Sequence, residues 1–258
     1  MNKQARKSFL FVEFDQFERD WLRGELLERA PGKGFRYIVT PNVDHVINLR
    51  FNPRWEIMHQ AYAHAAYVQN DSKILTVLAR TMGLALPAYP GSDLTCDIFE
   101  SMDKDAKVLI IGGDAGAPDK LKALFKLNHI DQHLPPFGLF NDAAARQVCV
   151  EKAIARDYDY IFIAVGSPQG ELIAYQIHQA SPPGGVALCT GASIDFLTGQ
   201  ARRAPVIFQK LAMEWAYRLM MEPKRLWRRY ILGLPKILLL YLVWARHSIF
   251  GGSAAPRP

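Results

Sequence analysis

Asp71 stands out among the polar residues of this sequence, because it lies in a short polar island between two apolar segments. Such an island can place a carboxylate at the mouth of a site, although a solvated turn has the same pattern. Other polar residues directly follow apolar runs: Thr40 and Asn42 follow one run, and Gln169 and Glu171 follow another. Because open parallel sheets bind ligands at the carboxyl ends of their strands, these five residues are candidates for catalysis and substrate binding at that edge.

Small residues form the turns after three runs of strand length. The turns are Gly112-Gly113-Asp114-Ala115-Gly116, Gly166-Ser167-Pro168 and Thr190-Gly191-Ala192. Turns of this kind let backbone N–H groups and helix N-termini face an anion, which predicts a nucleotide or sugar nucleotide, although glycine also serves simply to turn tightly. None of them contains a G-x-G-x-x-G or Walker A pattern, which argues against dinucleotide binding of that type and against P-loop ATP hydrolysis.

Metal-binding and nucleophile motifs are absent from the sequence. Two Asp-x-Asp triplets, Asp103-Lys104-Asp105 and Asp157-Tyr158-Asp159, precede strand-like runs and would lie at the amino edge of a parallel sheet, so we interpret them as polar turns. His129 and His133 are four residues apart, in a segment that suits a loop as well as a helix. There is no H-E-x-x-H and no G-x-S-x-G motif. We therefore predict no metal and no cofactor.

Composition indicates a globular protein whose positive charge is confined to one end. Half of the 258 residues are hydrophobic, which is enough to form a buried core. Residues 1–200 carry 20 Lys and Arg against 23 Asp and Glu, whereas residues 201–258 carry 11 against 2. The three cysteines, Cys96, Cys149 and Cys189, are widely separated. Neither a disulfide framework nor a zinc site is predicted, and a reducing cytoplasm fits.

The basic C-terminal part also contains interspersed tryptophan and tyrosine. This mixture suits a helix that lies on an anionic surface or closes over a phosphate-bearing ligand, because guanidinium groups match phosphate geometry and indole rings are stable at headgroup depth. A solvated basic helix is the alternative. The arginines available to bind phosphate are Arg218, Arg225, Arg228 and Arg229.

The apolar segment near the C-terminus is too short to span a membrane. Pro235 and Lys236 interrupt it and leave nine uninterrupted apolar residues, Ile237–Ala245, whereas a spanning helix needs about 20. We predict a helix that lies on one leaflet of a membrane, with a core helix of a soluble domain as the alternative. Residues 251–258 are small and proline-rich and are expected to be disordered.

Apolar runs of strand length alternate with amphipathic stretches of helix length, which predicts an α/β fold with a mostly parallel sheet and flanking helices. Asn52-Pro53 is a helix-start signal, and we expect that helix to reach about Tyr67. We divide the chain into a core at residues 1–200 and a helical appendage at 201–250. The predicted strands are Phe9–Phe14, Phe35–Val39, Lys107–Ile111, Tyr160–Val165 and Val186–Cys189.

Eight blocks along the chain carry a family resemblance. In order, they are Thr40-Pro41-Asn42-Val43-Asp44, Pro90-Gly91-Ser92-Asp93-Leu94, Gly112-Gly113, Pro135-Pro136-Phe137-Gly138, Gly166-Ser167-Pro168, Gly191-Ala192-Ser193-Ile194-Asp195-Phe196-Leu197-Thr198-Gly199, Arg203-Ala204-Pro205, and Glu214-Trp215 with Arg218 and Glu222-Pro223-x-Arg225. Together these blocks resemble the WecG/TagA/CpsF bacterial glycosyltransferases.

This resemblance implies a Rossmann-like core of the GT-E type and a metal-independent, inverting transferase without a cofactor. The implied donor is a UDP-sugar carrying N-acetylmannosamine, its uronic acid or glucose. The implied acceptor is a polyprenyl-diphosphate-linked saccharide used in cell-surface polysaccharide synthesis. The protein is expected on the cytoplasmic face of the bacterial inner membrane, as a peripheral protein on an anionic surface.

The resemblance also implies roles for single residues. Asp71 corresponds to the proposed catalytic base and Thr40 to a residue of the site, while the arginine-rich appendage would close over the active site. The chain departs from the family pattern at Asn70-Asp71-Ser72, where Ala-Asp-Gly is usual, and at Gly170 and Ala88, where glutamine and arginine are usual. The expected substrate contacts are Asn42, Gly112, Gly113, Pro136, Gly138, Gly166, Gln169, Glu171, Asp195, Arg203, Arg218, Arg225, Arg228 and Arg229.

Two other functions are compatible with the same residues. One is a non-catalytic component of a polysaccharide assembly complex that binds a sugar nucleotide or a lipid diphosphate. The other is a nucleic-acid-binding protein that uses the arginine-rich end. The net acidic charge of residues 1–200 argues against nucleic acid as a partner. A homo-oligomer stays open, because apolar faces of the appendage could pack on a second subunit.

Overall fold

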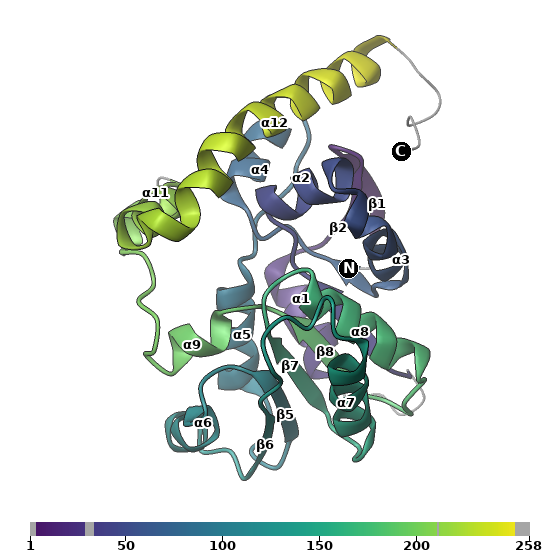
Figure 1. Ribbon diagram of the computed structural model, residues 1–258, viewed down its shortest axis with the longest axis vertical. Helices are drawn as coiled ribbons and strands as arrows, with labels where there is room; N and C mark the ends of the chain where they lie inside the picture. Colours follow the sequence, from purple (N-terminus) through teal and green to yellow (C-terminus); the bar gives the residue numbers. More distant parts are fainter. Residues whose placement is uncertain (1–3, 29–33, 211, 251–258) are drawn as a thin grey trace.

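The fold is a parallel sheet with helices on both faces, as the sequence predicts. The computed structural model describes residues 4–28, 34–210 and 212–250, and the expected disordered end at 251–258 lies outside them. Six strands form one sheet in the order β4-β3-β8-β7-β5-β6, and every neighbouring pair in it is parallel (Figure 1). They are β3 (Arg36–Val39), β4 (Tyr67–Val68), β5 (Lys107–Gly112), β6 (His129–His133), β7 (Tyr160–Ala164) and β8 (Val186–Cys189).

The helices of the core lie between these strands in sequence. Most follow a strand and return the chain to the amino edge of the sheet, which is how parallel neighbours are connected. The helices are α1 (Arg19–Leu27), α2 (Val43–Phe51), the short 3-10 helix η1 (Pro53–Trp55), α3 (Glu56–His64), α4 (Lys73–Arg80), α5 (Gly91–Ser101), α6 (Ala117–Phe125), α7 (Ala143–Ile154), α8 (Gln169–Gln179) and α9 (Ser193–Leu197).

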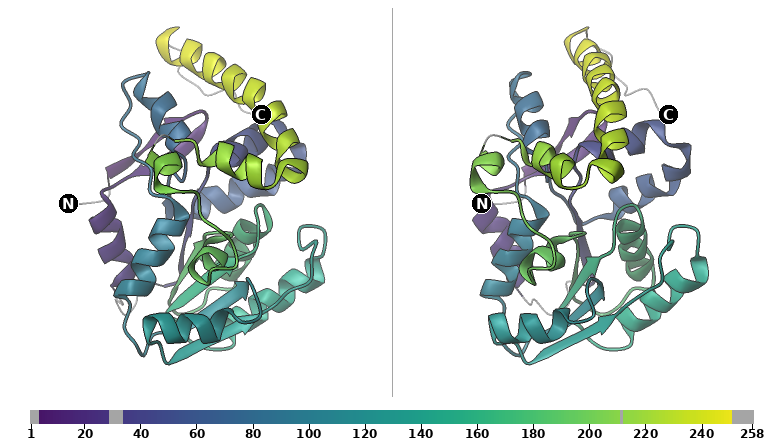
Figure 2. Two further views of the ribbon diagram at one scale, coloured as in Figure 1. Left: turned by 90° about the vertical axis from the view of Figure 1, so that its left-hand side faces the viewer. Right: turned by 60° about the vertical axis from the view of Figure 1, so that its left-hand side comes forward.

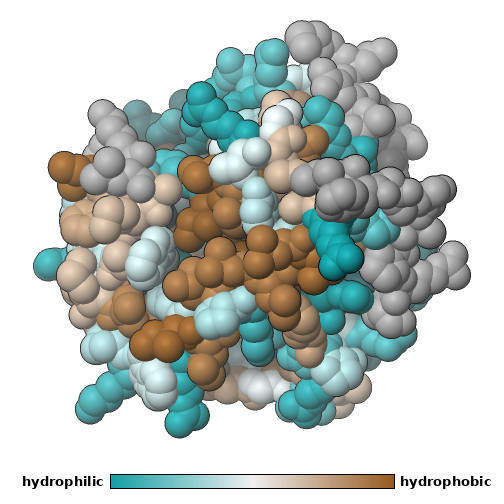
Figure 3. Space-filling view, turned by 90° about the horizontal axis from the view of Figure 1, so that it is seen from above, coloured by the Kyte–Doolittle hydropathy of each residue, from teal (hydrophilic) through white to brown (hydrophobic). Residues whose placement is uncertain are grey.

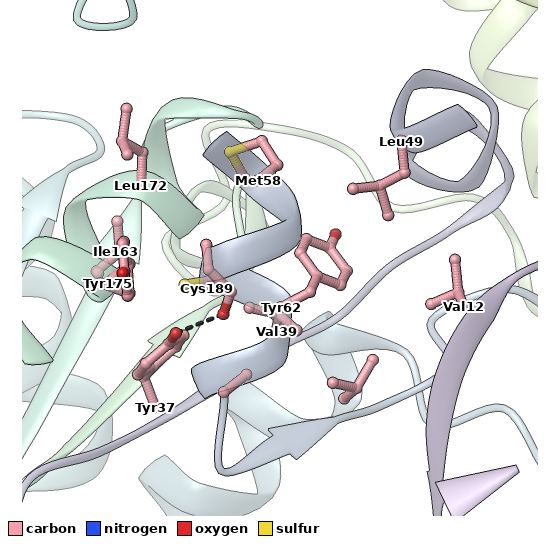
Figure 4. Close-up of a cluster of buried hydrophobic side chains, with 14 of the residues drawn as sticks. Val12, Tyr37, Val39, Leu49, Met58, Tyr62, Ile163, Leu172, Tyr175 and Cys189 are labelled. Carbon is pink, nitrogen blue, oxygen red and sulfur yellow. Dashed lines mark hydrogen bonds between the residues drawn. The ribbon is translucent and has the colours of Figure 1, made fainter. Parts of the chain in front are cut away.

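Alternate residues of the central strands enter two separate cores. In β7, Ile161 and Ile163 belong to one core, which contains residues of α2, α3, α7 and α8. Tyr160 and Phe162 belong to the other, which contains residues of α1, α5 and α6. Figure 4 shows the first core, where the Tyr37 hydroxyl donates a hydrogen bond to the Ala61 carbonyl of α3. Because both faces are covered, the strands are continuous apolar runs, which is why most of them could be predicted.

The N-terminal strand prediction is wrong. The segment Phe9–Phe14 contains the turn of an antiparallel hairpin, formed by β1 (Gln4–Phe9) and β2 (Val12–Gln16) outside the main sheet. Leu10 and Phe11 make the turn at positive φ values of 52° and 64°, which is unfavourable for residues with a Cβ. Leu10 is only 1% exposed, so its burial offsets the backbone cost.

Two further boundaries differ from the prediction. The helix expected to reach Tyr67 ends at His64, and Tyr67 pairs with β3 as the start of the two-residue strand β4. The segment from His129 to His133, expected to be a loop or helix, is the edge strand β6. A polar strand paired on only one side, such as β6, lacks the apolar run by which buried strands are recognised.

The C-terminal part forms three helices, α10 (Val206–Lys210), α11 (Glu214–Met221) and α12 (Pro223–Phe250). The chain rises from α9 to α11 along one side of the molecule, and α12 then runs back across the top, next to α2 (Figures 1 and 2). Pro235 lies within α12. None of the helices in the described residues, α12 included, combines the length and hydropathy of a membrane span.

One side of α12 is part of the core and the other is exposed. Ile237, Leu240 and Trp244 are buried with the core beside α2, and the Trp244 ring meets Phe9 edge-on at a centroid distance of 5.0 Å. Figure 3, which looks down on this part of the molecule, shows apolar side chains gathered on the outer face. The exposed large apolar residues of α12 are Trp227, Ile231, Leu232, Leu234, Leu238, Leu239, Leu242 and Val243.

The packing of α12 on the core predicts unequal effects of two tryptophan substitutions. Trp244 is 8% exposed and Trp227 is 43% exposed. Replacement of a buried tryptophan by alanine costs about 3–5 kcal/mol, so Trp244→Ala should lower the free energy of unfolding by about this amount in urea denaturation, and Trp227→Ala by much less. Equal losses for the two variants would contradict the packing of α12 on the core.

Candidate active site

A cleft opens where the two halves of the sheet meet. β3 and β8 are neighbours although about 150 residues separate them in sequence, and such a switch in strand order is where open α/β sheets bind ligands. The cleft, with its open mouth, has a volume of about 700 Å³. Its lining includes residues that follow four strands, namely Thr40 and Asn42 after β3, Asp71 after β4, Val165 and Ser167 after β7, and Thr190 and Gly191 after β8.

Asp71 is held in the cleft by backbone hydrogen bonds. Its N–H donates to the Pro41 carbonyl at 3.0 Å, and the Gly91 N–H, at the first residue of α5, donates to its Oδ1 at 2.6 Å. Burial raises the pKa of the Asp71 carboxyl above its usual value of 3.8, and this effect exceeds the lowering by the Gly91 N–H and by the charges of His45 and Arg218. A carboxylate with a raised pKa is a better proton acceptor, as a general base requires.

Gly91 allows α5 to begin directly against the catalytic candidates. A Cβ at this position would lie 3.2 Å from Thr40 Oγ1 and 3.6 Å from Asp71 Oδ1. The Thr40 hydroxyl donates to the Cys189 carbonyl at 2.9 Å, so it links the end of β3 to the end of β8. The small glycine therefore keeps the Gly91 N–H within reach of Asp71.

Several helices start around the cleft. α2, α5 and α8 begin at or next to residues that line it. The Asn42 side chain caps α2 by accepting from the Asp44 N–H at 3.0 Å, and Ser72 caps α4 by accepting from the Leu75 N–H. Helix N-termini carry free N–H groups and partial positive charge, so the site can hold oxyanions such as a diphosphate.

His45 is part of the site, although the sequence analysis did not identify it. It is the third residue of α2 and lines the cleft. Its Nδ1 lies 2.9 Å from Asn42 Oδ1 and its Nε2 lies 3.1 Å from Glu171 Oε1. The available signal was the spacing Asn-x-x-His, because an Asn cap with a hydrogen-bonding residue three positions later marks a helix start.

An apolar groove continues from the cleft. It lies along α11 and α12 and has a volume of about 1400 Å³ with its open side. Asn42, Asp71 and Arg218 line both spaces. Beyond them, the groove is lined mainly by apolar or aromatic residues, which are Val43, Ile47, Ile74, Ala212, Trp215, Tyr230, Gly233, Leu234 and Ile237.

Two of the four expected arginines lie at this junction. The Arg218 guanidinium lies over the Phe196 ring, 5.3 Å from its centroid, and forms no ion pair within the described part of the chain. Arg229 lies 3.4 Å from Asp44 and lines the groove. Arg228 lies over its neighbour Trp227 and lines neither space. The side chain of Arg225, in α12, is outside the described residues.

Four of the predicted contacts lie at or after the carboxyl ends of β5 and β6 and line neither space. Gly112 and Gly113 have positive φ and pack closely, since a Cβ on Gly112 would lie 2.9 Å from the Ala164 carbonyl oxygen. Pro136 and Gly138 are exposed on the loop after β6. Their contact with substrate stays a prediction.

The remaining predicted contacts lie outside both spaces. The Gln169 amide lies against the Gly166 carbonyl of its own loop, at 2.9 Å. Burial and the charge of Asp114 raise the pKa of Asp195, on α9. Arg203 pairs with Asp93 of α5, and so fastens the segment after α9. None of these four predicted residues, Gly166 included, lines the cleft or the groove, and their contact with substrate stays a prediction.

No group of three or more His, Cys, Asp or Glu side chains that could hold a metal ion occurs in the described residues. The two Asp-x-Asp triplets precede β5 and β7, at the amino edge. There, Asp159 accepts from the Lys107 N–H at 2.7 Å and Asp103 from the Asp105 N–H at 2.8 Å. Both triplets therefore lie at the edge of the sheet opposite the cleft, as predicted from the sequence.

Comparisons with known proteins give one family and a curated relative. The sequence profile described as "Glycosyl transferase WecG/TagA/CpsF family" matches residues 7–249. An N-acetylglucosaminyldiphosphoundecaprenol N-acetyl-β-D-mannosaminyltransferase of Bacillus spizizenii is 26% identical to this chain over 217 residues, which is 82% of this chain and 80% of the relative.

The raised pKa of Asp71 predicts that Asp71→Asn stabilises the protein at neutral pH. Above the pKa that Asp71 has in the folded protein, its ionised carboxylate lowers the free energy of unfolding. Below the pKa that it has in the unfolded chain, the carboxyl is protonated in both states and this loss disappears. The gain in free energy of unfolding should therefore grow as the pH rises from the unfolded to the folded pKa and then stay constant. Urea unfolding at several pH values measures it, with the exposed Asp119→Asn as control. A loss of stability at neutral pH would contradict the assignment.

Proposed function

This chain belongs to the glycosyl transferase WecG/TagA/CpsF family, and we propose that it is an inverting glycosyltransferase that moves a sugar from a UDP-sugar to a polyprenyl-diphosphate-linked saccharide. The observation that carries this proposal is the position of Asp71. It lines both the polar cleft and the apolar groove, so one carboxylate can meet a nucleotide sugar on one side and a lipid-linked acceptor on the other.

Asp71 acts as the base in a single displacement. As the acceptor hydroxyl oxygen forms a bond to the anomeric carbon, its proton passes to Asp71, and the bond from that carbon to the UDP oxygen breaks with its electron pair going to UDP. Attack on the face opposite the leaving group inverts the anomeric configuration. Positioned proton transfer of this kind contributes about 10²–10⁴-fold to a rate, and the raised pKa of Asp71 favours it.

The diphosphate charge is stabilised by protein groups in a metal-independent reaction. The N-termini of α2, α5 and α8 lie around the cleft, and their free N–H groups bind anions. Arg218 adds a guanidinium without a carboxylate partner among the described residues, and charge-assisted hydrogen bonds from arginine to phosphate are strong. These groups would neutralise the charge that develops on UDP.

The groove supplies a place for the acceptor lipid. The groove is lined by the carboxylate of Asp71, by Arg218 and Arg229, and by apolar walls. These three kinds of group match the saccharide, the diphosphate and the isoprenoid chain of a lipid-linked acceptor. The name of the Bacillus spizizenii relative describes an undecaprenyl-diphosphate acceptor and transfer of N-acetylmannosamine, which supports a lipid-linked acceptor and makes N-acetylmannosamine the first donor sugar to test, before its uronic acid and glucose.

The exposed apolar side of α12 supports peripheral binding at the cytoplasmic face of the inner membrane. Leu238, Leu239 and Leu242 are about half exposed on this helix, and basic residues precede them in α12. Apolar and basic side chains on one helix favour binding to the surface of an anionic bilayer. In this proposal residues 201–250 act as the membrane-binding appendage of the core.

Replacement of Asp71 separates catalysis from binding. Asp71→Asn should reduce UDP release from UDP-N-acetylmannosamine, with polyprenyl-diphosphate N-acetylglucosamine as acceptor, by about 10²–10⁴-fold, while UDP affinity in calorimetry is retained. Asp119→Asn, on the exposed side of α6, should release UDP at the wild-type rate. Full turnover by Asp71→Asn would remove the residue from the mechanism. Binding without UDP release in the wild-type protein would favour a non-catalytic binding component.

A substitution that fills the groove should act on the lipid chain alone. A Cβ on Gly233 would lie 3.5 Å from Ile47 Cδ1, so the side chain of Gly233→Leu would occupy the groove, and leucine suits a helix better than glycine. We expect at least a tenfold lower kcat/KM with a long polyprenyl acceptor in detergent, corresponding to about 1.4 kcal/mol, and little change with a short one. Gly24→Leu, which makes the same change at an exposed position of α1 where an added Cβ would meet open space, is the control. Equal losses with both acceptors would contradict a lipid-binding groove.

A further inference from the structure

Glu171 has a buried carboxylate oxygen with no partner. The residue is 4% exposed, lies in the first turn of α8 and lines the cleft. Its Oε1 is 3.1 Å from His45 Nε2, whereas its Oε2 has no hydrogen bond among the described residues. Burial of a charged oxygen without a partner is costly. The proposed proton transfer to Asp71 does not use this oxygen.

Two hydroxyl groups in the same cleft are also unpartnered. Ser167 Oγ, after β7, and Thr190 Oγ1, after β8, are buried and have no hydrogen bond among the described residues. Both residues line the cleft together with Glu171. Buried polar groups are usually hydrogen-bonded, so three unpartnered oxygens in one cleft indicate a polar ligand.

The contacts of the His45 ring show which of its nitrogens carries the proton that faces Glu171. The Asn42 N–H can donate only to a bare Nδ1, at 3.3 Å, and this leaves the proton on Nε2. In the alternative arrangement, Nδ1 carries a proton and donates it to Asn42 Oδ1. An unprotonated Nε2 could not bond to the Glu171 carboxylate, because both are acceptors, so in this arrangement Nε2 is protonated as well and the ring is an imidazolium. In either arrangement Nε2–H donates to Oε1, and Oε2 remains an acceptor.

The three unpartnered oxygens are suited to bind a ring that carries several hydroxyl groups. An ionised carboxylate only accepts hydrogen bonds and repels phosphate, whereas the serine and threonine hydroxyls both donate and accept. We infer that Glu171, with Ser167 and Thr190, binds neighbouring hydroxyl groups of a sugar ring in the nucleotide-sugar donor, and that His45 is its positioning residue. This inference rests on the proposed glycosyltransferase function. The ring is either the ribose or the transferred sugar, and both offer neighbouring hydroxyls.

Calorimetry with Glu171→Gln tests this subsite and identifies the ring. If the subsite binds the ribose, the wild-type protein binds 2′-deoxy-UDP at least about tenfold more weakly than UDP. Glu171→Gln then weakens UDP binding by a similar factor, and the variant binds UDP and 2′-deoxy-UDP with the same affinity. If the transferred sugar is bound, UDP affinity is unchanged in the variant, and affinity for UDP-N-acetylmannosamine or UDP-glucose falls about tenfold or more.

The control and the contrary outcomes separate this inference from the proposed function. Glu151→Gln makes the same change at an exposed position on α7 and should leave every affinity unchanged. If the wild-type protein binds the donors and Glu171→Gln binds all of them equally well, the subsite is wrong and the proposed function stands. If the wild-type protein binds neither UDP nor a UDP-sugar, the proposed function fails and the inference fails with it.

His45→Gln tests the positioning role without removing the helix cap. Glutamine is a usual third residue of a capping box, so the variant should keep the wild-type Tm and show a higher donor KM with a nearly unchanged kcat. In the Glu171→Gln background it should add little, because the two residues act as one unit. Additive losses of affinity in the double variant would show that His45 acts independently of Glu171 and would overturn its positioning role. A lower Tm with unchanged KM would assign His45 a structural role only.

Discussion

A partly buried carboxylate, placed where a polar cleft meets an apolar groove, is the feature on which the rest of this structure depends. Burial disfavours the charge of Asp71 and raises its pKa, while the Gly91 N–H at 2.6 Å and the nearby Arg218 partly compensate. Because its pKa is raised, the Asp71 carboxylate takes up a proton more readily than a surface aspartate does. The surrounding elements can be understood as the means of holding it there.

Two halves of the sheet supply this environment together. The β3–β4 half contributes Asp71 and Thr40, and the half from β5 to β8 contributes the turns after β7 and β8 together with α8. The hydrogen bond from Thr40 to the Cys189 carbonyl joins the two at the floor of the site. The helix α12 adds the wall of the groove while its inner side is part of the core. Stability and site geometry therefore depend on the same contacts.

Most of the sheet could be predicted because its central strands are apolar on both faces. The parts that could not be predicted lack that signal: β4 has two residues, β6 is a polar edge strand, and the β1–β2 turn uses Leu10 and Phe11 at positive φ. The helices α2 and α4 were missed although Asn42 and Ser72 cap them. Asn42 was interpreted only as a site residue, and in the structure it both caps α2 and lines the cleft.

Some site residues could be predicted from the sequence around them, whereas others depend on contacts between residues far apart in the chain. Asp71, Thr40, Asn42 and Glu171 follow strands or begin helices, and their positions at the carboxyl edge could be predicted from sequence order. The role of His45 depends on a contact with a residue 126 positions away, which no local pattern specifies. Arginine content alone likewise could not separate Arg218, which lines the cleft, from Arg228 and Arg229, which do not.

The pH dependence of kcat/KM for sugar transfer, compared between the wild-type protein and Asp71→Glu, tests the central claim most directly. The account predicts that activity is lost as the pH falls through the pKa of Asp71, with a midpoint above the usual 3.8, and that the midpoint shifts in the Asp71→Glu variant because a different carboxyl then titrates. An acidic limb that is identical in the two proteins would show that another group accepts the proton.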